Sequence, residues 1–172
     1  MPLMRRMNAT IGTVVFFVLA PGVVAGAIPW WLTGWDVGIS LPTVVRACGA
    51  VLTAAGVVVL MQAFARFVRE GRGTPAPVAP TETLVVGGLY RFVRNPMYLA
   101  VLATIVGQAL LLGRPILFGY AFVVWLAFAS FVRVYEEPHL TERFGDGYRA
   151  YREHVPAWIP RPRPWSPSDI DG

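Results

Sequence analysis

The residues best suited to chemistry in this 172-residue chain are two adjacent carboxylates and a short polar segment that precedes an apolar run. The carboxylates are Glu136 and Glu137, and the segment is Arg94-Asn95-Pro96. Asparagine is a good N-cap and proline is favoured at the first helical position, so the segment predicts a helix start. Free N–H groups at a helix start attract anions, whereas paired carboxylates attract cations. Together the two groups could hold a zwitterion, such as an amino acid moiety, if the fold brings them together.

The elements that must position these residues are apolar helices. Hydrophobic residues make up 55% of the chain and charged residues only 15%, against about 25% charged residues in an ordinary soluble domain. Uncharged or nearly uncharged stretches cover residues 7–35, 47–65, 95–113 and 115–132, and each approaches or exceeds the roughly 20 residues that cross a bilayer as a helix. The sequence therefore predicts an all-α integral membrane protein with four transmembrane helices. This composition excludes a soluble globular enzyme and a disordered chain, and a single cysteine, Cys48, excludes a disulfide framework.

The connection between the third and fourth predicted spans is only Gly113-Arg114-Pro115. So short a connection predicts a tight helical hairpin with antiparallel helices of similar length. Residues 94–96 at the start of the third span should then lie beside Glu136-Glu137 at the end of the fourth.

The arginines orient the predicted spans. All 15 basic residues are arginines, and with both termini cytoplasmic only Arg46 and Arg114 fall on the outer side, as the positive-inside rule favours. Anchoring at anionic headgroups explains this charge better than nucleic-acid binding does, and we expect no nucleic-acid partner. The predicted location is the inner (plasma) membrane of a bacterium. An alternative is that the N-terminal run ending in Ala25-Gly26-Ala27 is a cleaved signal peptide; the continuation of the apolar run to residue 35 favours a retained helix.

Composition divides the chain into three parts. Residues 1–68 are predicted to form a two-span scaffold, in which Gly49, Ala50 and Gly56 allow close helix packing. Residues 69–162 hold the third and fourth spans and most of the arginine, tyrosine and glutamate, and residues 163–172 are predicted to be a flexible tail. Tyr148 and Tyr151 recur at helical spacing after Gly145, which predicts a cytosolic amphipathic segment that could lie at the membrane surface or cover the polar cluster. No spacing of metal ligands is present, so no metal site is predicted.

The ordered combination of these features resembles the superfamily of isoprenylcysteine carboxyl methyltransferases and phospholipid methyltransferases. The resemblance covers about residues 70–162. It rests on Gly-Leu-Tyr-Arg-Phe-Val-Arg-Asn-Pro-Met-Tyr at 88–98, the hairpin, Glu136-Glu137, and Phe144-Gly145 with Tyr148, Tyr151 and Val155-Pro156. The resemblance implies a membrane methyltransferase that uses S-adenosyl-L-methionine. The family often has Arg-His-Pro where this chain has Arg-Asn-Pro, so no imidazole is available at position 95.

The same resemblance assigns site residues. Six would bind the cofactor: Arg94, Asn95, Pro96, Tyr98, Glu136 and Glu137. Five would contact the pocket or substrate: Tyr90, Arg91, Arg143, Tyr148 and Tyr151.

Methyl transfer from an activated donor mainly requires alignment and exclusion of water, so no dedicated nucleophile is expected. The sequence does not decide whether the accepting group of the lipophilic substrate is a carboxylate, an amine or a thiol. A carboxylate is ionised at neutral pH and needs no base, whereas an amine needs one, for which Glu137 and His139 are the main candidates. The alternative function is a non-enzymatic membrane scaffold whose tail binds anionic lipid, which leaves the paired carboxylates unexplained. A transporter is less favoured because no span carries a central ionisable residue.

Overall fold

The computed structural model describes residues 20–70, 84 and 86–166, with side chains for all of these except 63–70. In these residues the regular elements are all helical and no strand is present, which confirms the predicted all-α class. The elements in chain order are η1 (Val23–Ala27), α2 (Ile28–Thr33), α3 (Thr43–Glu70), η2 (Gly88–Arg91), α4 (Pro96–Leu112), α5 (Ile116–Phe131), η3 (Val132–Glu136) and α6 (Glu137–His154).

Two helices in the described part of the chain are long and apolar enough to cross a membrane. One is Thr43–Gln62 within α3, and the other is the continuous run Ile116–His154 formed by α5, η3 and α6. Helix α4 is apolar but shorter, with 17 residues. The first predicted span lies partly outside the described residues, so the four-span topology stays a prediction.

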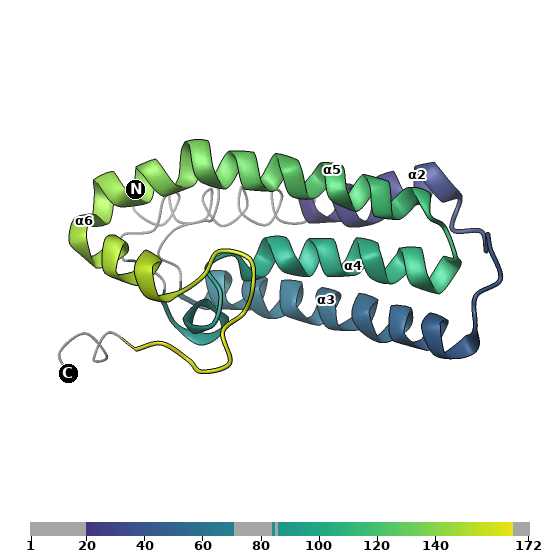
Figure 1. The fold of residues 1–172 in the computed structure, drawn as a ribbon, viewed down its shortest axis with the longest axis horizontal. Helices are drawn as coiled ribbons and strands as arrows, with labels where there is room; N and C mark the ends of the chain where they lie inside the picture. The colour runs from purple at the N-terminus through teal and green to yellow at the C-terminus, as the bar shows by residue number, and fades with distance from the viewer. Residues whose placement is uncertain (1–19, 71–83, 85, 167–172) are drawn as a thin grey trace, which may run out of the picture.

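The tight hairpin between α4 and α5 is confirmed. Helix α4 ends at Gly113, which adopts a left-handed conformation (φ 62°), and α5 begins three residues later. The amide of Arg114 donates to the carbonyl of Ala109 over 3.0 Å, and the amide of Ile39 donates to the carbonyl of Gly113 over 2.9 Å. A side chain at Gly113 would collide with the Ile39 carbonyl, so glycine is required both by its φ angle and by this close approach. The two helices run antiparallel across the molecule (Figure 1).

Helices α3 and α4 pack with their backbones close together through glycines. A Cβ atom on Gly49 would lie 2.5 Å from the amide nitrogen of Leu111, and one on Gly107 would lie 2.6 Å from the amide nitrogen of Thr53. Gly56 similarly faces the Ala100 carbonyl. The predicted role in close packing is therefore confirmed for Gly49 and Gly56, whereas Ala50 is exposed.

Polar side chains join the N-terminal helical segment to α4 and α5 within the apolar region. The Gln108 amide donates to the Ala25 carbonyl over 2.7 Å and accepts from Trp35 Nε1 over 3.2 Å. The Tyr120 hydroxyl donates to the Val24 carbonyl over 2.8 Å. Because Val24 and Ala25 lie in a π-helical turn, these bonds satisfy carbonyls in a segment with irregular hydrogen bonding.

The C-terminal region folds back over the start of α4. Gly145 (φ 54°, ψ −125°) interrupts α6, and the second half of α6 turns back toward the segment that precedes α4 (Figure 1). Tyr148, Tyr151 and Val155 form a small second core with Trp165, whose side chain is 3% exposed. Trp165 lies within the tail predicted to be flexible, so the packed chain extends at least to that residue. Placement of α6 at a membrane surface and the division into domains stay predictions.

Candidate functional site

The start of α4 and the end of the α5–η3 helix meet in one polar cluster. Arg94 Nη1 lies 2.7 Å from Glu137 Oε1, and the Tyr98 hydroxyl donates to Glu136 Oε1 over 2.6 Å. The antiparallel hairpin causes this meeting, because the two helices are nearly equal in length and share a turn at their other ends. The predicted proximity of Arg94 to Glu136-Glu137 is therefore confirmed, whereas the assigned roles stay predictions.

Glu137 is held by arginines on both carboxylate oxygens. Besides Arg94 on Oε1, Arg152 Nη2 lies 3.3 Å from Oε2. Arg94 is also fixed, because Nε donates to the Val155 carbonyl over 2.9 Å and Nη1 to the Tyr148 hydroxyl over 3.2 Å. The side chains of Arg94 and Glu137 are each 12% exposed. Because both oxygens of Glu137 already contact guanidinium groups, the geometry favours an anchoring role for this residue over that of a base.

Glu136 has a different environment. Its carboxylate accepts the Tyr98 hydroxyl, and no basic side chain in the described part of the chain pairs with it. It lies beyond the apolar part of its helix, which ends with α5 at Phe131. Burial raises the pKa of Glu136 above its usual value, the hydrogen bond from Tyr98 opposes this rise, and the neighbouring charge of Glu137 adds to it. A partly buried carboxylate without an arginine partner is well suited to face a cationic group of a ligand.

Asn95 occupies the N-cap position of α4, but its side chain does not cap the helix. Instead, Asn95 Nδ2 donates to the Ala157 carbonyl over 3.2 Å, which corrects the expectation of a capping side chain. Pro96 stands at the first turn as predicted. The asparagine side chain is used for a contact more than sixty residues away, and this contact competes with local capping.

Residues 155–165 form a segment without helix or strand, here called the C-terminal strap, that is hydrogen-bonded to the residues before α4. The Arg94 amide donates to the Pro156 carbonyl, and the Arg161 amide to the Phe92 carbonyl, each over 2.9 Å. The strap runs beside the residues preceding α4 in Figure 1. The strap therefore holds the start of α4 at a fixed distance from the end of α6.

The residues predicted to contact the pocket or substrate divide into two groups. Tyr148 and Tyr151 are buried, and the Tyr151 hydroxyl donates to the Tyr90 carbonyl over 2.7 Å. Arg91 Nε donates to the Trp165 carbonyl over 2.7 Å, so these residues hold the strap and α6 against the segment before α4. Arg143 is exposed and lies over the Phe144 ring, outside this network.

His139, a candidate base, is also placed apart from this network. It is exposed, and its ring stacks on that of Tyr135 with 5.1 Å between centroids. The structure thus shows it in contact with its own helix rather than joined to the cluster around Arg94.

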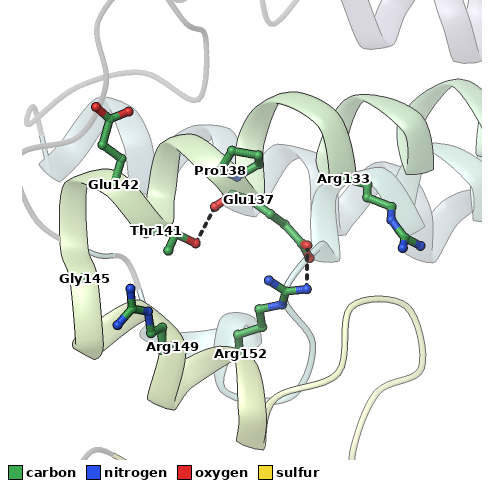
Figure 2. A pocket seen from close by; sticks show the side chains of 8 residues that line it. All are labelled: Arg133, Glu137, Pro138, Thr141, Glu142, Gly145, Arg149 and Arg152. Carbon is green, nitrogen blue, oxygen red and sulfur yellow. Dashed lines mark hydrogen bonds and ion pairs between the residues drawn. The ribbon is translucent and has the colours of Figure 1, made fainter.

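A pocket of about 660 Å³ lies in the bend of α6 (Figure 2). Its size falls within the range of small-molecule sites. Its lining residues are Arg133, Glu137, Pro138, Thr141, Glu142, Gly145, Arg149 and Arg152. The pocket shares Glu137 with the polar cluster, and Figure 2 shows Arg152 turned toward this glutamate across the bend.

Several pocket residues were not predicted as site residues. Arg133, Glu137 and Thr141 recur at intervals of four, and Arg149 and Arg152 at an interval of three, which places each set on one helix face. This spacing was a usable signal, but only the bend at Gly145 turns the two faces toward each other. The lining carries guanidinium groups and carboxylates together, a donor set that matches a zwitterion.

Comparisons with known proteins agree with the geometry. The phospholipid methyltransferase family matches residues 44–147. Protein-S-isoprenylcysteine O-methyltransferase B of Arabidopsis thaliana is 28% identical over 151 residues, which cover 87% of this chain and 67% of the relative. The Schizosaccharomyces pombe protein-S-isoprenylcysteine O-methyltransferase is 36% identical over 78 residues, covering 45% of this chain and 33% of the relative. The human protein-S-isoprenylcysteine O-methyltransferase is 35% identical over 81 residues, which cover 46% of this chain and 28% of the relative.

The chain thus spans between about a quarter and two thirds of the length of these relatives. The family match extends from the start of α3 to the second half of α6, and it includes the hairpin and both halves of the polar cluster. It covers more than half of the chain, and the chain therefore belongs to the phospholipid methyltransferase family.

Proposed function

We propose that this protein transfers a methyl group from S-adenosyl-L-methionine to a lipophilic acceptor at the cytosolic face of a membrane. The observation that carries the proposal is the meeting of Arg94–Glu137 and Tyr98–Glu136 at one end of the α4–α5 hairpin. The names of the relatives, protein-S-isoprenylcysteine O-methyltransferases, support methyl transfer to a group attached to a lipid chain.

The residues present fit this cofactor. Its methionine part is a zwitterion and its sulfur is cationic, and when bound it supplies a methyl group that is already activated. Glu136 has no arginine partner among the described residues and would face the positive charge. Arg133, which lines the pocket, would hold the carboxylate through charge-assisted hydrogen bonds, whereas Arg149 of the same lining already pairs with Asp146. Glu137 and Arg94 keep the two helices in register around this ligand.

The acceptor decides whether a proton must move. A carboxylate acceptor is already ionised, and then the protein needs only to align it and exclude water. An amine acceptor must lose a proton as the new N–C bond forms and the S–C bond breaks. Glu136 Oε2 is the better position for that proton, because both oxygens of Glu137 contact guanidinium groups.

We further propose that four spans cross the membrane with both termini cytoplasmic, in the plasma membrane of a bacterium. The hairpin supports this topology by placing Arg114 at one end of the molecule and Arg94, Arg133 and the strap at the other. An excess of arginine on one side favours that side as the cytoplasmic one.

The test uses the full chain purified into nanodiscs. Titration calorimetry with S-adenosylhomocysteine should give saturable binding, and Arg94→Gln should weaken it, whereas Arg46→Gln should not, because Arg46 bonds the Leu111 carbonyl at the hairpin end. Radiolabelled methyl donor added to native membranes should label a lipid-soluble product, and base lability would distinguish a methyl ester from an N-methyl amine. Absence of S-adenosylhomocysteine binding to folded wild-type protein, with retention on anionic vesicles, would instead support the scaffold alternative.

A further inference from the structure

We propose that Trp158 of the C-terminal strap is a specificity-determining residue that packs against the hydrocarbon chain of the methyl acceptor. This inference rests on the proposed methyl transfer and adds a residue and a place for the apolar part of the substrate. The structure gives three independent reasons for it: a continuous line of aromatic rings, the way in which the strap is held, and the exposure of the rings farthest from the polar cluster.

The aromatic line begins in the polar cluster. Tyr98, which bonds Glu136, has its ring centroid 4.5 Å from that of Phe128 and 6.5 Å from that of Trp158. Trp158 lies in turn 6.3 Å from Trp125, at a steep interplanar angle of 70°. Phe122 continues the line at 5.8 Å from Trp125. These separations are those of aromatic rings in contact, so one apolar surface leads from Glu136 along α5.

Trp158 is the member of this line that no helix supplies. The strap brings it there, because the Arg94 amide donates to the Pro156 carbonyl and Asn95 Nδ2 donates to the Ala157 carbonyl. The two residues directly before Trp158 are thus fixed to the start of α4. The Asn95 side chain, which does not cap α4, therefore has a different role: it sets the position of the strap relative to Tyr98.

The line is exposed at its far end. Phe122 is 58% exposed and Trp125 36% exposed, and both lie on α5, within a helix long and apolar enough to cross a membrane. At 1.5 Å per residue, Phe122 lies about 21 Å along the helix from Glu136. An extended hydrocarbon chain beside α5 would therefore have its end group near Glu136 while its tail lies along the aromatic rings.

The magnitude expected from Trp158 is modest for a physical reason. Lipid tails are as apolar as protein side chains, so moving a hydrocarbon chain from the bilayer to this surface gains little from the hydrophobic effect. The gain comes from dispersion contacts with rigid aromatic faces. Loss of one such face should weaken acceptor use about 3- to 10-fold.

The experiment measures acceptor use and cofactor binding separately. Full-length protein is placed in nanodiscs that contain increasing fractions of the total lipid extract of the source membranes. The diluent is dioleoylphosphatidylcholine, whose quaternary amine accepts no further methyl group. Incorporation of labelled methyl gives the half-saturating fraction of extract and the maximal rate, and calorimetry gives the affinity for S-adenosylhomocysteine.

For Trp158→Ala, the half-saturating fraction should rise about 3- to 10-fold, with affinity for S-adenosylhomocysteine within twofold of wild type. Trp158→Phe should restore most of the loss. Trp31→Ala, at an exposed tryptophan of α2, should behave as wild type. Should Trp158→Ala not fold, Phe122→Ala interrupts the same line without touching the strap and should shift the half-saturating fraction in the same direction.

An unchanged half-saturating fraction in a folded variant, with cofactor-analogue binding intact, would overturn the role of Trp158. Equal loss of affinity for S-adenosylhomocysteine would also overturn it, since Trp158 would then belong to the cofactor site. A wild-type protein that neither binds S-adenosylhomocysteine nor labels any lipid would refute the proposed function itself, which is a distinguishable result.

Discussion

The ion pair between Arg94 and Glu137 joins the start of α4 to the start of α6, and a double-mutant cycle tests whether it holds the site together. The cycle compares the single variants Arg94→Gln and Glu137→Gln with the double variant that carries both substitutions. Each glutamine keeps the approximate length of a polar side chain but removes the charge. Because the two side chains are each 12% exposed, the partner left behind in each single variant is a largely buried charge.

The expected magnitude follows from the contacts that each variant loses. Glu137→Gln weakens a charge-assisted bond to Arg94, which is worth about 1.5–3 kcal/mol, and a bond to Arg152, whose side chain is 52% exposed and which contributes at most about 1 kcal/mol. Arg94→Gln also loses the bond from Nε to the Val155 carbonyl. The double variant should cost less than the sum of the single variants, with a coupling of about 1–3 kcal/mol.

The assay is thermal unfolding of detergent-solubilised protein, in parallel with the affinity for S-adenosylhomocysteine. A matched control is the pair Arg149–Asp146, which has a similar separation of 2.8 Å but side chains that are 65% and 95% exposed. The cycle on that pair should give a coupling below about 1 kcal/mol. A coupling for Arg94–Glu137 no larger than that of the control would refute the reasoning that burial makes this pair the anchor of the site.

Three further predictions concern packing, polar bonding and pH. Gly49→Ala should lower the unfolding temperature, at a cost of about 1–3 kcal/mol, because its Cβ would lie 2.5 Å from the Leu111 amide nitrogen; Gly119→Ala, with open space around it, should not, and equal effects would contradict the packing argument. Gln108→Leu should cost about 1–2 kcal/mol in the same assay, since it loses three side-chain hydrogen bonds, two of them to the N-terminal segment. An unchanged unfolding temperature would show that these bonds add no stability. Burial raises the pKa of Glu136, so the protonated carboxyl favours the folded state. This contribution to the free energy of unfolding is complete at low pH and is lost as pH rises through the raised pKa. Unfolding temperatures measured across that range should fall more for wild type than for Glu136→Gln, and parallel curves would contradict the shift.

Much of the site's position follows from local rules that the sequence displays. Gly113 and Pro115 mark the turn, Pro96 marks the start of α4, and the similar lengths of the two apolar runs bring Arg94 to Glu137. The family resemblance was readable from the same ordered residues and is confirmed by the match over residues 44–147. The sequence also places Gly145 directly before the helical spacing of Tyr148 and Tyr151, and glycine can interrupt a helix, but the bend itself is seen only in the structure.

The sequence by itself determined that apolar helices would form and that a short turn would pair two of them, because helix length and turn chemistry are properties of neighbouring residues. Only the tertiary structure decided which partners the polar side chains take. Asn95 bonds Ala157 instead of its own helix, Arg152 returns to Glu137 across the bend of α6, and Trp158 reaches Tyr98. These contacts join segments that the chain separates by 15 to more than 60 residues, and their register depends on how whole elements pack, which no local pattern specifies.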